Sequence, residues 1–341
     1  MEMGLDLGDI VSAVARKLED FRGKAVAIDA FNTLYQFLAI IRQPDGTPLM
    51  DSQGRITSHL SGLLYRTANL VQYGVNPVFV FDGEPPKLKA KTIKERVEVK
   101  KRAEREWEEA LEEGDMARAK SKAMQTSRLT NEMVSQSKRL LELMGIPSVQ
   151  APGEGEAQAS AMAARGDVFA AASQDYDSLL FGAPILLRNI TVTGRRKLPR
   201  KNVYVDVEPE QIDLAAALSS LAVTREQLVD MGILIGTDFN EGVRGIGPKK
   251  ALALVKECGT LERATSKLGI QIENAQDIRE LFLSPQTTYD YSLNWVEPDL
   301  EGIRGMLCEE HGFSQERVSA ALDKMSEAVR SRKQRSLDQW F

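Results

Sequence analysis

Two short apolar runs decide the fold, Lys24-Ala-Val-Ala-Ile-Asp29 and Val75-Asn-Pro-Val-Phe-Val-Phe-Asp82. Each has the length and composition of a buried strand, and each ends in an aspartate. Residues 57–73, which lie between them, have the apolar spacing of a helix. Further strands are predicted at residues 168–174 and 184–188. Strands that alternate with helices predict an α/β fold with a central, mostly parallel sheet flanked by helices.

The composition limits the chemistry that the chain can perform. Of its 341 residues, 43% are hydrophobic and 27% are charged, as in soluble globular proteins. No apolar run approaches the about 20 residues of a membrane span, and the N-terminus lacks a secretory-signal pattern. Two cysteines and two histidines argue against a thiolate cluster or a His-rich zinc site. We therefore expect a cytoplasmic protein whose chemistry rests on carboxylates, lysine, arginine or hydroxyl groups.

Carboxylates gather where the predicted strands end. Two strands end in aspartate, and a third runs into a pair of aspartates. Two glutamates lie at a predicted helix start, and another aspartate precedes a glycine-rich segment. Ligands of open parallel sheets collect at the carboxyl ends of the strands, so we expect these acids to converge there. The acids are Asp29, Asp82, Glu154, Glu156, Asp175, Asp177 and Asp238.

Carboxylates that crowd together raise one another's pKa unless a cation neutralises them. Mg²⁺ suits oxygen ligands, and two such ions about 3.5–4 Å apart activate water and stabilise the leaving oxygen in phosphodiester cleavage. A single strand-end aspartate is more often a helix cap or a turn former, and either glutamate alone would be an ordinary first-turn acid. The repetition of strand-end acids without matching histidines favours a Mg²⁺ site.

The order of these motifs along nearly the whole chain resembles that of the flap endonucleases, above all the archaeal members of this branch of the XPG family. The segments that carry the resemblance are Ala27-Ile-Asp29-Ala, Val80-Phe-Asp82-Gly-Glu-Pro-Pro, Gln150-Ala-Pro-Gly-Glu154-Gly-Glu156-Ala, Ser173-Gln-Asp175-Tyr-Asp177, Gly236-Thr-Asp238 and Arg244-Gly-Ile-Gly-Pro-Lys-Lys250. The resemblance implies a PIN-like 5′ nuclease fold whose seven acids hold two Mg²⁺ ions, with Mn²⁺ able to substitute.

The activity that the resemblance implies is cleavage near the base of 5′ flaps, accompanied by 5′→3′ exonuclease activity. Such an enzyme, a monomer that binds branched DNA, would act in Okazaki-fragment maturation and base excision repair. The net charge of −5 does not exclude this, because a protein that is acidic overall can be basic along one groove. Opening the duplex end would cost a few kcal/mol of unstacking, as in base flipping.

The implied organisation is a single nuclease domain over residues 1–330. It comprises an N-terminal part at 1–105, a helical arch at about 84–133, and an internal part at about 125–262 with a helix-hairpin-helix motif at about 228–258. The arch covers a run rich in lysine and arginine that then turns acidic. Lys89 and Arg96 match the basic pair of the family's arch helix, where they would bind the scissile phosphate and offset its developing charge. The neighbouring lysines are expected to form a solvated helix face.

Other DNA contacts rest on the resemblance. Tyr35 belongs to an apolar helical stripe that would bury it, whereas the family stacks this position on a DNA base; we favour the family role. Thr57 matches a pocket for a one-nucleotide 3′ flap. His59 is expected to be structural, and Arg42 and Arg66 could be plain surface charges. The remaining positions that match DNA-contacting residues are Arg42, Arg66, Glu154, Gly236, Asp238, Gly245, Gly247, Lys249 and Lys250.

The segment Gly245-Ile-Gly247-Pro-Lys-Lys250 resembles a helix-hairpin-helix turn. A close backbone approach and a helix N-terminus make such a turn a phosphate site. Taken alone, Gly-x-Gly between helices is more often only a tight turn. A Walker loop is absent, so ATP is not implied.

The chain ends in Gln334-Arg-Ser-Leu337-Asp-Gln-Trp340-Phe341. One helical turn would bring Leu337, Trp340 and Phe341 together as an apolar plug, and exposed aromatic anchors are typical of interfaces. The spacing, led by Gln334, resembles the clamp-binding peptide of replication proteins. It implies that residues 331–341 are a flexible tail that binds the sliding clamp PCNA; the alternative is a tail folded back on its own core.

Alternative functions stay open at this point. A 5′→3′ exonuclease or repair nuclease would share the acidic site, but the arch and the tail favour the flap enzyme. A non-catalytic scaffold for branched DNA and the clamp would gain nothing from concentrated negative charge. A carboxylate-dependent phosphatase would explain neither the hairpin motif nor the tail. The family begins Met-Gly, whereas Met1-Glu2-Met3 precedes Gly4 here, so the sequence leaves open a start at Met1 or Met3.

Overall fold

A seven-stranded sheet runs through the centre of the chain in the order β1-β9-β6-β5-β2-β3-β4. In the structure, a computed structural model, the backbone is described for residues 5–192, 194–197 and 204–338, and the side chains for 5–192 and 207–330. A separate pair of antiparallel strands, β7 with β8, completes the strands. Their bounds are β1 Val14–Ala15, β2 Ala25–Asp29, β3 Asn76–Phe81, β4 Ser148–Gln150, β5 Ala170–Ala172, β6 Ile185–Arg188, β7 Gly194–Lys197, β8 Tyr204–Val207 and β9 Glu210–Asp213.

The four predicted strands form the middle of this sheet as β2, β3, β5 and β6, which confirms the expectation of a mostly parallel α/β fold. Strand β2 pairs in parallel with β3 on one side and β5 on the other, and Asp29 lies opposite Val80. The pairs β3–β4 and β5–β6 are also parallel. Only β9, against β6 and β1, runs antiparallel. The carboxyl ends of β2, β3 and β5 therefore lie side by side.

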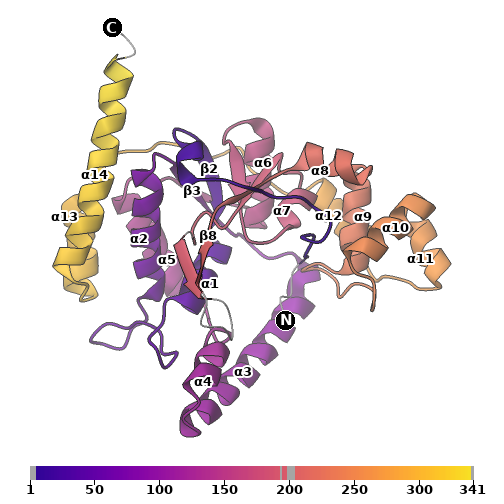
Figure 1. The fold of residues 1–341 in the computed structure, drawn as a ribbon, viewed down its shortest axis with the longest axis horizontal. Coiled ribbons are helices and arrows are strands. Elements are labelled where there is room, and N and C mark those ends of the chain that lie inside the picture. The colour runs from indigo at the N-terminus through magenta and orange to yellow at the C-terminus, as the bar shows by residue number, and fades with distance from the viewer. Residues whose placement is uncertain (1–4, 193, 198–203, 339–341) are drawn as a thin grey trace.

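Helices cover both faces of the sheet (Figure 1). Short helical turns are η1 Leu18–Phe21 and η2 Lys87–Lys89, and η3 Gly305–Glu310 is a π-helical turn. The α-helices are α1 Ala30–Ile40, α2 Ser58–Gln72, α3 Ala90–Glu112, α4 Met116–Ala123, α5 Asn131–Leu143, α6 Gly155–Arg165, α7 Asp177–Leu180, α8 Leu214–Leu221, α9 Arg225–Ile235, α10 Pro248–Cys258, α11 Leu261–Leu268, α12 Ala275–Leu283, α13 Leu300–Arg304 and α14 Gln315–Asp338.

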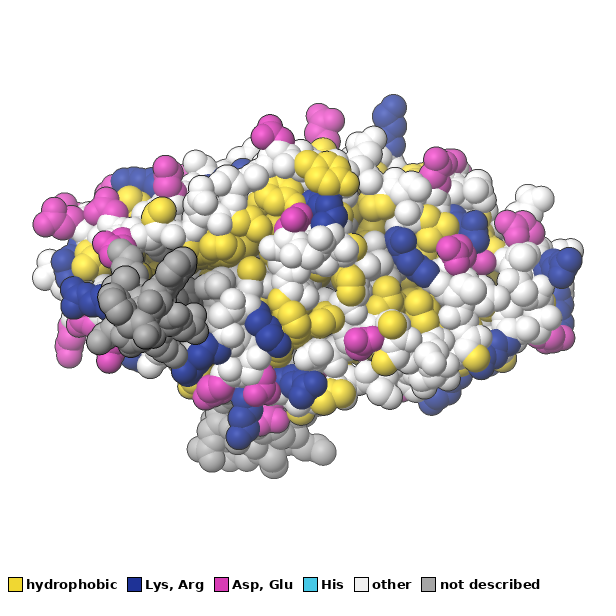
Figure 2. Space-filling model, turned by 90° about the horizontal axis from the view of Figure 1, so that it is seen from above, with side chains coloured by type: hydrophobic (Ala, Val, Ile, Leu, Met, Phe, Trp, Pro, Cys, Tyr) yellow, Lys and Arg dark blue, Asp and Glu magenta, His cyan; other side chains and the backbone are white. Residues whose placement is uncertain are grey.

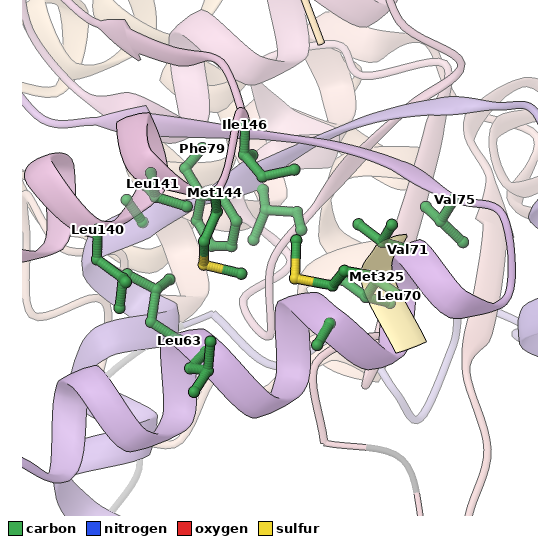
Figure 3. Close-up of a cluster of buried hydrophobic side chains, with 14 of the residues drawn as sticks. Leu63, Leu70, Val71, Val75, Phe79, Leu140, Leu141, Met144, Ile146 and Met325 are labelled. Carbon is green, nitrogen blue, oxygen red and sulfur yellow. The ribbon is translucent and has the colours of Figure 1, made fainter. Parts of the chain in front are cut away.

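Alternate side chains of the central strands enter different cores, as the two-residue period of a strand requires. Phe79 of β3 faces the larger core, which it shares with Leu63 and Leu70 of α2, Leu140 of α5 and Met325 of α14 (Figure 3). Residues on the other face of the strands contact α6 and an extended segment that leads to α13. A third cluster joins α7 to helices α8–α12. These clusters hold the strand ends in a fixed relation to α6 and α9.

The charged segment after β3 forms a helical hairpin, α3 with α4, that projects from the body (Figure 1). Along α3 only Ala103 and Ala110 are buried, and α4 buries only Ala119 and Ala123. The hairpin is tied to the loop after α1 by Trp107, whose Nε1 donates a hydrogen bond to the Asp45 carbonyl at 3.2 Å. Most of the remaining hairpin surface carries charge, as the sequence predicts, although Ile93, Val97 and Met116 are also exposed. In the part of the chain that the structure describes, no helix could span a membrane.

Candidate active site

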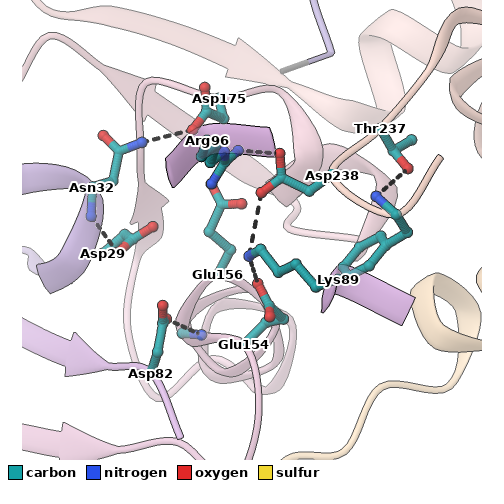
Figure 4. Close-up of polar contacts among 12 residues, drawn as sticks. Asp29, Asn32, Asp82, Lys89, Arg96, Glu154, Glu156, Asp175, Thr237 and Asp238 are labelled. Atoms are coloured by element: carbon teal, nitrogen blue, oxygen red, sulfur yellow. Dashed lines mark hydrogen bonds and ion pairs between the residues drawn. The ribbon is translucent and has the colours of Figure 1, made fainter. Parts of the chain in front are cut away.

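Two acids of the predicted cluster are fixed by the ends of adjacent strands. Asp29 is the last residue of β2 and the N-cap of α1, where its Oδ1 accepts a hydrogen bond from the Asn32 amide at 3.0 Å. Asp82 follows β3, and its Oδ1 accepts a hydrogen bond from the Gly155 amide at 2.7 Å. Because Gly155 is the first residue of α6, this bond holds the start of α6 beside the strand ends (Figure 4).

The start of α6 supplies two more acids. Glu154 occupies the N-cap position, yet its side chain does not cap the helix. Instead, its Oε2 accepts a hydrogen bond from Lys89 Nζ at 2.5 Å. Glu156, in the first turn, accepts a hydrogen bond from Ser178 Oγ at 3.3 Å. Both glutamates therefore point into the site rather than serving only the helix end.

Asp175 and Asp177 lie beyond the end of β5. Asp175 Oδ2 accepts a hydrogen bond from Asn32 Nδ2 at 2.6 Å. Asp177 begins α7 and is only 5% exposed, and its Oδ1 is buried without a hydrogen-bond partner. A buried carboxylate oxygen without a donor is costly unless a cation reaches it.

Asp238 comes from the loop between α9 and α10, far from the strand ends in sequence. Two glycines shape this loop, Gly236 with φ of 115° and Gly242 with φ of 69°. A Cβ atom at Gly242 would lie 2.1 Å from the Ile235 carbonyl oxygen, so only glycine fits there. The loop presents Asp238 to the arch: its Oδ2 lies 3.2 Å from Lys89 Nζ, and its Oδ1 forms an ion pair with Arg96.

Burial and mutual repulsion act together on the acids. Burial, followed by repulsion from Asp82, raises the pKa of Asp29 well above its usual value. Burial also raises the pKa of Glu156 and of Asp177 well above the usual range, with repulsion from Asp175 and from Asp238 as the next causes. The pKa of Asp82 rises to about 6 because of its burial and the nearby Glu154. Such a cluster is stable as anions only beside cations.

Two cations at the cluster are the arch residues that the sequence singled out, and Arg188 also attracts Asp175. Burial lowers the pKa of Lys89, but attraction from Glu154 and Asp238 outweighs burial and raises it. Lys89 is 14% exposed, and its two partners are nearly as buried. Figure 4 shows Lys89 between Glu154 and Asp238, with Arg96 on the far side of Asp238. The seven acids and the two arch bases thus lie around one site.

The donor set fits a hard divalent ion, since it contains only oxygen ligands and includes the partnerless Asp177 Oδ1. In the structure, however, several of these carboxylates already have side-chain partners. Within the described residues, no three acids are placed to hold one ion together. Glu154 and Asp238 are engaged by the arch bases, and Asp175 is engaged by Asn32.

Asn32 was missed by the sequence reasoning. It lies three residues after Asp29, on the first turn of α1, and it contacts two of the acids through its amide and its side chain. The sequence signal that could have identified Asn32 is its position three residues after Asp29, the N-cap at the end of a strand, because residues three apart in a helix share a face.

The predicted DNA-contacting side chains of the first helices have different surroundings. Tyr35 is 37% exposed, with Lys100 Nζ 4.6 Å from the ring centroid, so it is not buried as its apolar stripe suggested. Arg42 is used within the protein, since its guanidinium donates to the Leu38 and Gly46 carbonyls at 2.8 Å. Thr57 is buried. Arg66 is half-buried and lines a cavity of about 600 Å³.

The predicted hairpin motif lies between α9 and α10. Gly247 is the N-cap of α10, Pro248 opens the helix, and Lys250 Nζ donates to the Gly245 carbonyl at 2.9 Å. Lys249 is exposed, and its Nζ lies 3.2 Å from Asp9 Oδ2. His59, expected to be structural, is buried against Gln136 at 2.9 Å. Of the predicted clamp-binding residues, Trp340, Phe341 and the side chains of Gln334 and Leu337 lie outside the described residues.

A mostly parallel sheet, an acid cluster at its strand ends and a basic helical hairpin facing that cluster define an acid-cluster nuclease of the α/β class. The chain matches the XPG N-terminal domain over residues 3–103 and the XPG I-region over residues 145–238. It is 53% identical to flap endonuclease 1 of Thermococcus onnurineus, over 99% of both chains. It is 55% identical to flap endonuclease 1 of Archaeoglobus fulgidus, over 99% of this chain and 100% of the relative. The chain therefore belongs to the flap endonuclease family.

Solved structures agree with this assignment. The flap endonuclease-1 from Methanococcus jannaschii matches 96% of this chain and 100% of its own, with a TM-score of 0.77 and 43% identity. The catalytic core of Rad2 in complex with DNA substrate matches 91% of this chain and 95% of its own, with a TM-score of 0.68. At 23% identity, the Rad2 likeness concerns the fold alone.

Proposed function

We propose that this chain is a structure-specific 5′ flap endonuclease that hydrolyses the DNA backbone near the base of 5′ flaps, with accompanying 5′→3′ exonuclease activity. One observation carries the proposal: acids from three adjacent strand ends, from the start of α6 and from the 236–242 loop meet two bases of the arch. A scaffold for DNA would gain nothing from such a concentration of negative charge.

The seven acids would hold two Mg²⁺ ions, with Mn²⁺ as a substitute. Bound ions would supply an activated water and neutralise the charge that develops on the phosphate. The chain's own bases complete this electrostatic role, because Lys89 and Arg96 sit at the acid cluster and would bind the scissile phosphate. Burial keeps water away from Lys89 and its two partner acids, which strengthens their charge interactions.

Contacts with the rest of the substrate would come from three places. The exposed ring of Tyr35 is a stacking platform for a base at the junction. The start of α10, with Gly245, Gly247, Lys249 and Lys250, would bind backbone phosphates of the duplex. Arg42, Thr57 and Arg66 would line the path of the remaining DNA. Arg42 has fewer N–H groups left to donate to DNA, because its guanidinium already donates hydrogen bonds to the Leu38 and Gly46 carbonyls.

The cellular role follows from the reaction. Removal of 5′ flaps leaves nicks that can be sealed, as Okazaki-fragment maturation and base excision repair require. We propose that the enzyme acts as a monomer and is recruited by the sliding clamp PCNA through residues Gln334, Leu337, Trp340 and Phe341. The sequence of the tail supports this recruitment.

Cleavage of a 5′-labelled flap DNA tests the proposal, beside a matched single strand and a matched blunt duplex, with Mg²⁺ or with EDTA. We expect Mg²⁺-dependent cutting at the flap base. The Asp175→Ala variant should bind the flap as the parent does but lose cutting by more than about a hundredfold, the scale of losing an electrostatic catalytic group. Binding without cutting by the parent would favour a scaffold, and stepwise release from blunt ends would favour an exonuclease.

A further inference from the structure

The two arch bases occupy oxygen atoms that a divalent ion would need. Lys89 Nζ lies 2.5 Å from Glu154 Oε2 and 3.2 Å from Asp238 Oδ2, and Arg96 holds the other oxygen of Asp238. Lys89, Glu154 and Asp238 are 14%, 12% and 17% exposed, so the two Lys89 ion pairs are shielded from solvent, whereas Arg96 is 36% exposed. In the described residues, no three acids are placed together for one ion.

We infer that Lys89 and Arg96 compete with divalent metal for Glu154 and Asp238, so that metal loading and release of the arch from the acid cluster are one coupled event. This inference rests on the proposed function, because it concerns the ions of that same site. It concerns a different property, however: the affinity of the DNA-free protein for metal and the position of its arch, not the reaction.

The physical argument is a comparison of two ways to neutralise the same carboxylates. Buried acids need cations, and among the described residues Lys89 and Arg96 of the arch supply them to Glu154 and Asp238. A divalent ion brings two charges and accepts several oxygen ligands, but it must displace the ammonium and guanidinium groups first. Once released from Glu154 and Asp238, Lys89 and Arg96 are available to a phosphate.

The geometry of the arch makes this exchange feasible. Helix α3 buries only two alanines, so few apolar contacts hold its charged length to the body. Its start, at η2 and Lys89, is where the ion pairs form. The buried pairs of Lys89, with the pair of Arg96 and the exposed Lys91–Glu241 pair, draw this end of α3 toward α6 and the 236–242 loop (Figure 4).

By reciprocity, metal and a backbone phosphate should favour each other. A phosphate that binds Lys89 and Arg96 frees the two acids, and a metal that binds the acids frees the two bases. Such a coupling between two ligands changes each affinity by the same factor, typically about 5- to 150-fold. The enzyme would thus assemble its complete site only when both the metal and the DNA backbone are present.

The test measures Mn²⁺ binding to the full chain without DNA, by calorimetry and by the electron paramagnetic resonance signal of free Mn²⁺. The variants are Lys89→Ala and Arg96→Ala, which remove the competitors. Lys91→Ala is the matched control: Lys91 is on the same helix but pairs with the exposed Glu241, so it removes the same charge without freeing a site acid. We expect each of the first two variants to bind Mn²⁺ about tenfold more tightly, and the control to bind within twofold of the parent.

Hydrogen exchange of the arch gives a second readout. In the parent, added Mg²⁺ should speed amide exchange at the start of α3, while in Lys89→Ala exchange there should be fast before metal is added. Unchanged or weaker Mn²⁺ affinity in both variants would overturn the inference. An equal gain in Mn²⁺ affinity in Lys91→Ala would overturn it too, because the gain would then come only from the loss of a positive charge at long range. Failure of the proposed function is distinct, because it would appear as a parent enzyme that does not cut flaps.

Discussion

Asp177 and His59 each bury a polar atom without a hydrogen-bond partner, and their surroundings give these atoms opposite meanings. Asp177 Oδ1 lies among other acids, where a cation can satisfy it. His59 Nδ1 lies in the interior on the buried side of α2, while Nε2 donates to Gln136 Oε1 at 2.9 Å. Burial lowers the pKa of the His59 ring by more than the hydrogen bond with Gln136 raises it, so the ring is held neutral. Asp177 Oδ1 is therefore part of the acid cluster of the active site, whereas His59 Nδ1 affects the stability of the fold.

His59 should make the stability of the fold depend on pH. Burial lowers its pKa to about 4, whereas an exposed histidine titrates near about 6.5. Between these pH values the unfolded chain binds a proton at His59 that the folded chain does not bind, so the free energy of unfolding falls as the pH falls. The loss from pH 6.5 to pH 4 should reach about 3 kcal/mol from this residue.

Urea unfolding of the parent and of His59→Gln at several pH values between 7 and 4 measures this effect. The variant cannot take up a proton at this position, so its stability should fall less steeply over the same window. His311 is present in both proteins and cancels in the comparison. Parallel stability curves would show that His59 is not the source.

At the scale of elements, the central strands and the convergence of their terminal acids could be predicted, because β2, β3 and β5 are short apolar runs and parallel strands end at one edge. The edge strands β1 and β4, and β9 next to β1, could not, because their exposed residues interrupt any apolar run. The pairing of Lys89 with Glu154 and Asp238 could not be predicted from the sequence either. It joins residues 65 positions apart or more, and no local pattern records such a contact.

The contact between α1 and α2 depends on a glycine. A Cβ atom added at Gly62 would lie 2.3 Å from Phe37 Cγ, and both residues are buried in the larger core. We expect Gly62→Ala to destabilise the fold by about 1–3 kcal/mol, the usual cost of overpacking. Gly62→Val should lose more than Gly62→Ala, because its two methyl groups add further atoms against the Phe37 side chain.

Gly305→Ala is the matched control for this substitution. Gly305 has a helical φ of −55°, and an added Cβ there meets nothing within 4 Å. Its stability should be equal to that of the parent or higher by up to about 1 kcal/mol, because alanine favours helical backbone. Chemical unfolding of the four proteins measures the set. A Gly62→Ala variant as stable as the parent would show that α1 can move away from α2 without cost.

At the scale of the whole molecule, the parts that the proposed function uses lie apart. In Figure 1 the α3–α4 hairpin projects from the body, with α10 and α11 at one end and α14 at the other. Figure 2 views the face away from the hairpin, where acidic and basic side chains are interspersed. This face therefore concentrates neither sign of charge, whereas the acid cluster and the arch bases do so locally, and such local concentration reconciles a net charge of −5 with binding of DNA.

The separation of α14 from the site predicts how the tail contributes. Helix α14 contacts α2, far along the fold from α6 and the 236–242 loop. Its last residues include Gln334 and Leu337 of the proposed clamp-binding peptide, and Trp340 and Phe341 follow it at the end of the chain. Deletion of residues 334–341 should therefore leave kcat and KM for a flap substrate unchanged and abolish stimulation by the clamp. Each apolar anchor that is lost should weaken clamp binding by about 2 kcal/mol, or about thirtyfold.

Flap cleavage with and without PCNA measures both effects in the parent, in the deletion and in Trp340→Ala. Asp338→Ala is the control, since it changes the same segment but keeps Leu337, Trp340 and Phe341. It should retain stimulation, because the apolar anchors and not the intervening acid carry the binding energy. Stimulation that survives the deletion would place the clamp contact elsewhere on the body. A loss of intrinsic cutting would instead mean that the tail supports the fold, as a segment turned back on its own core would.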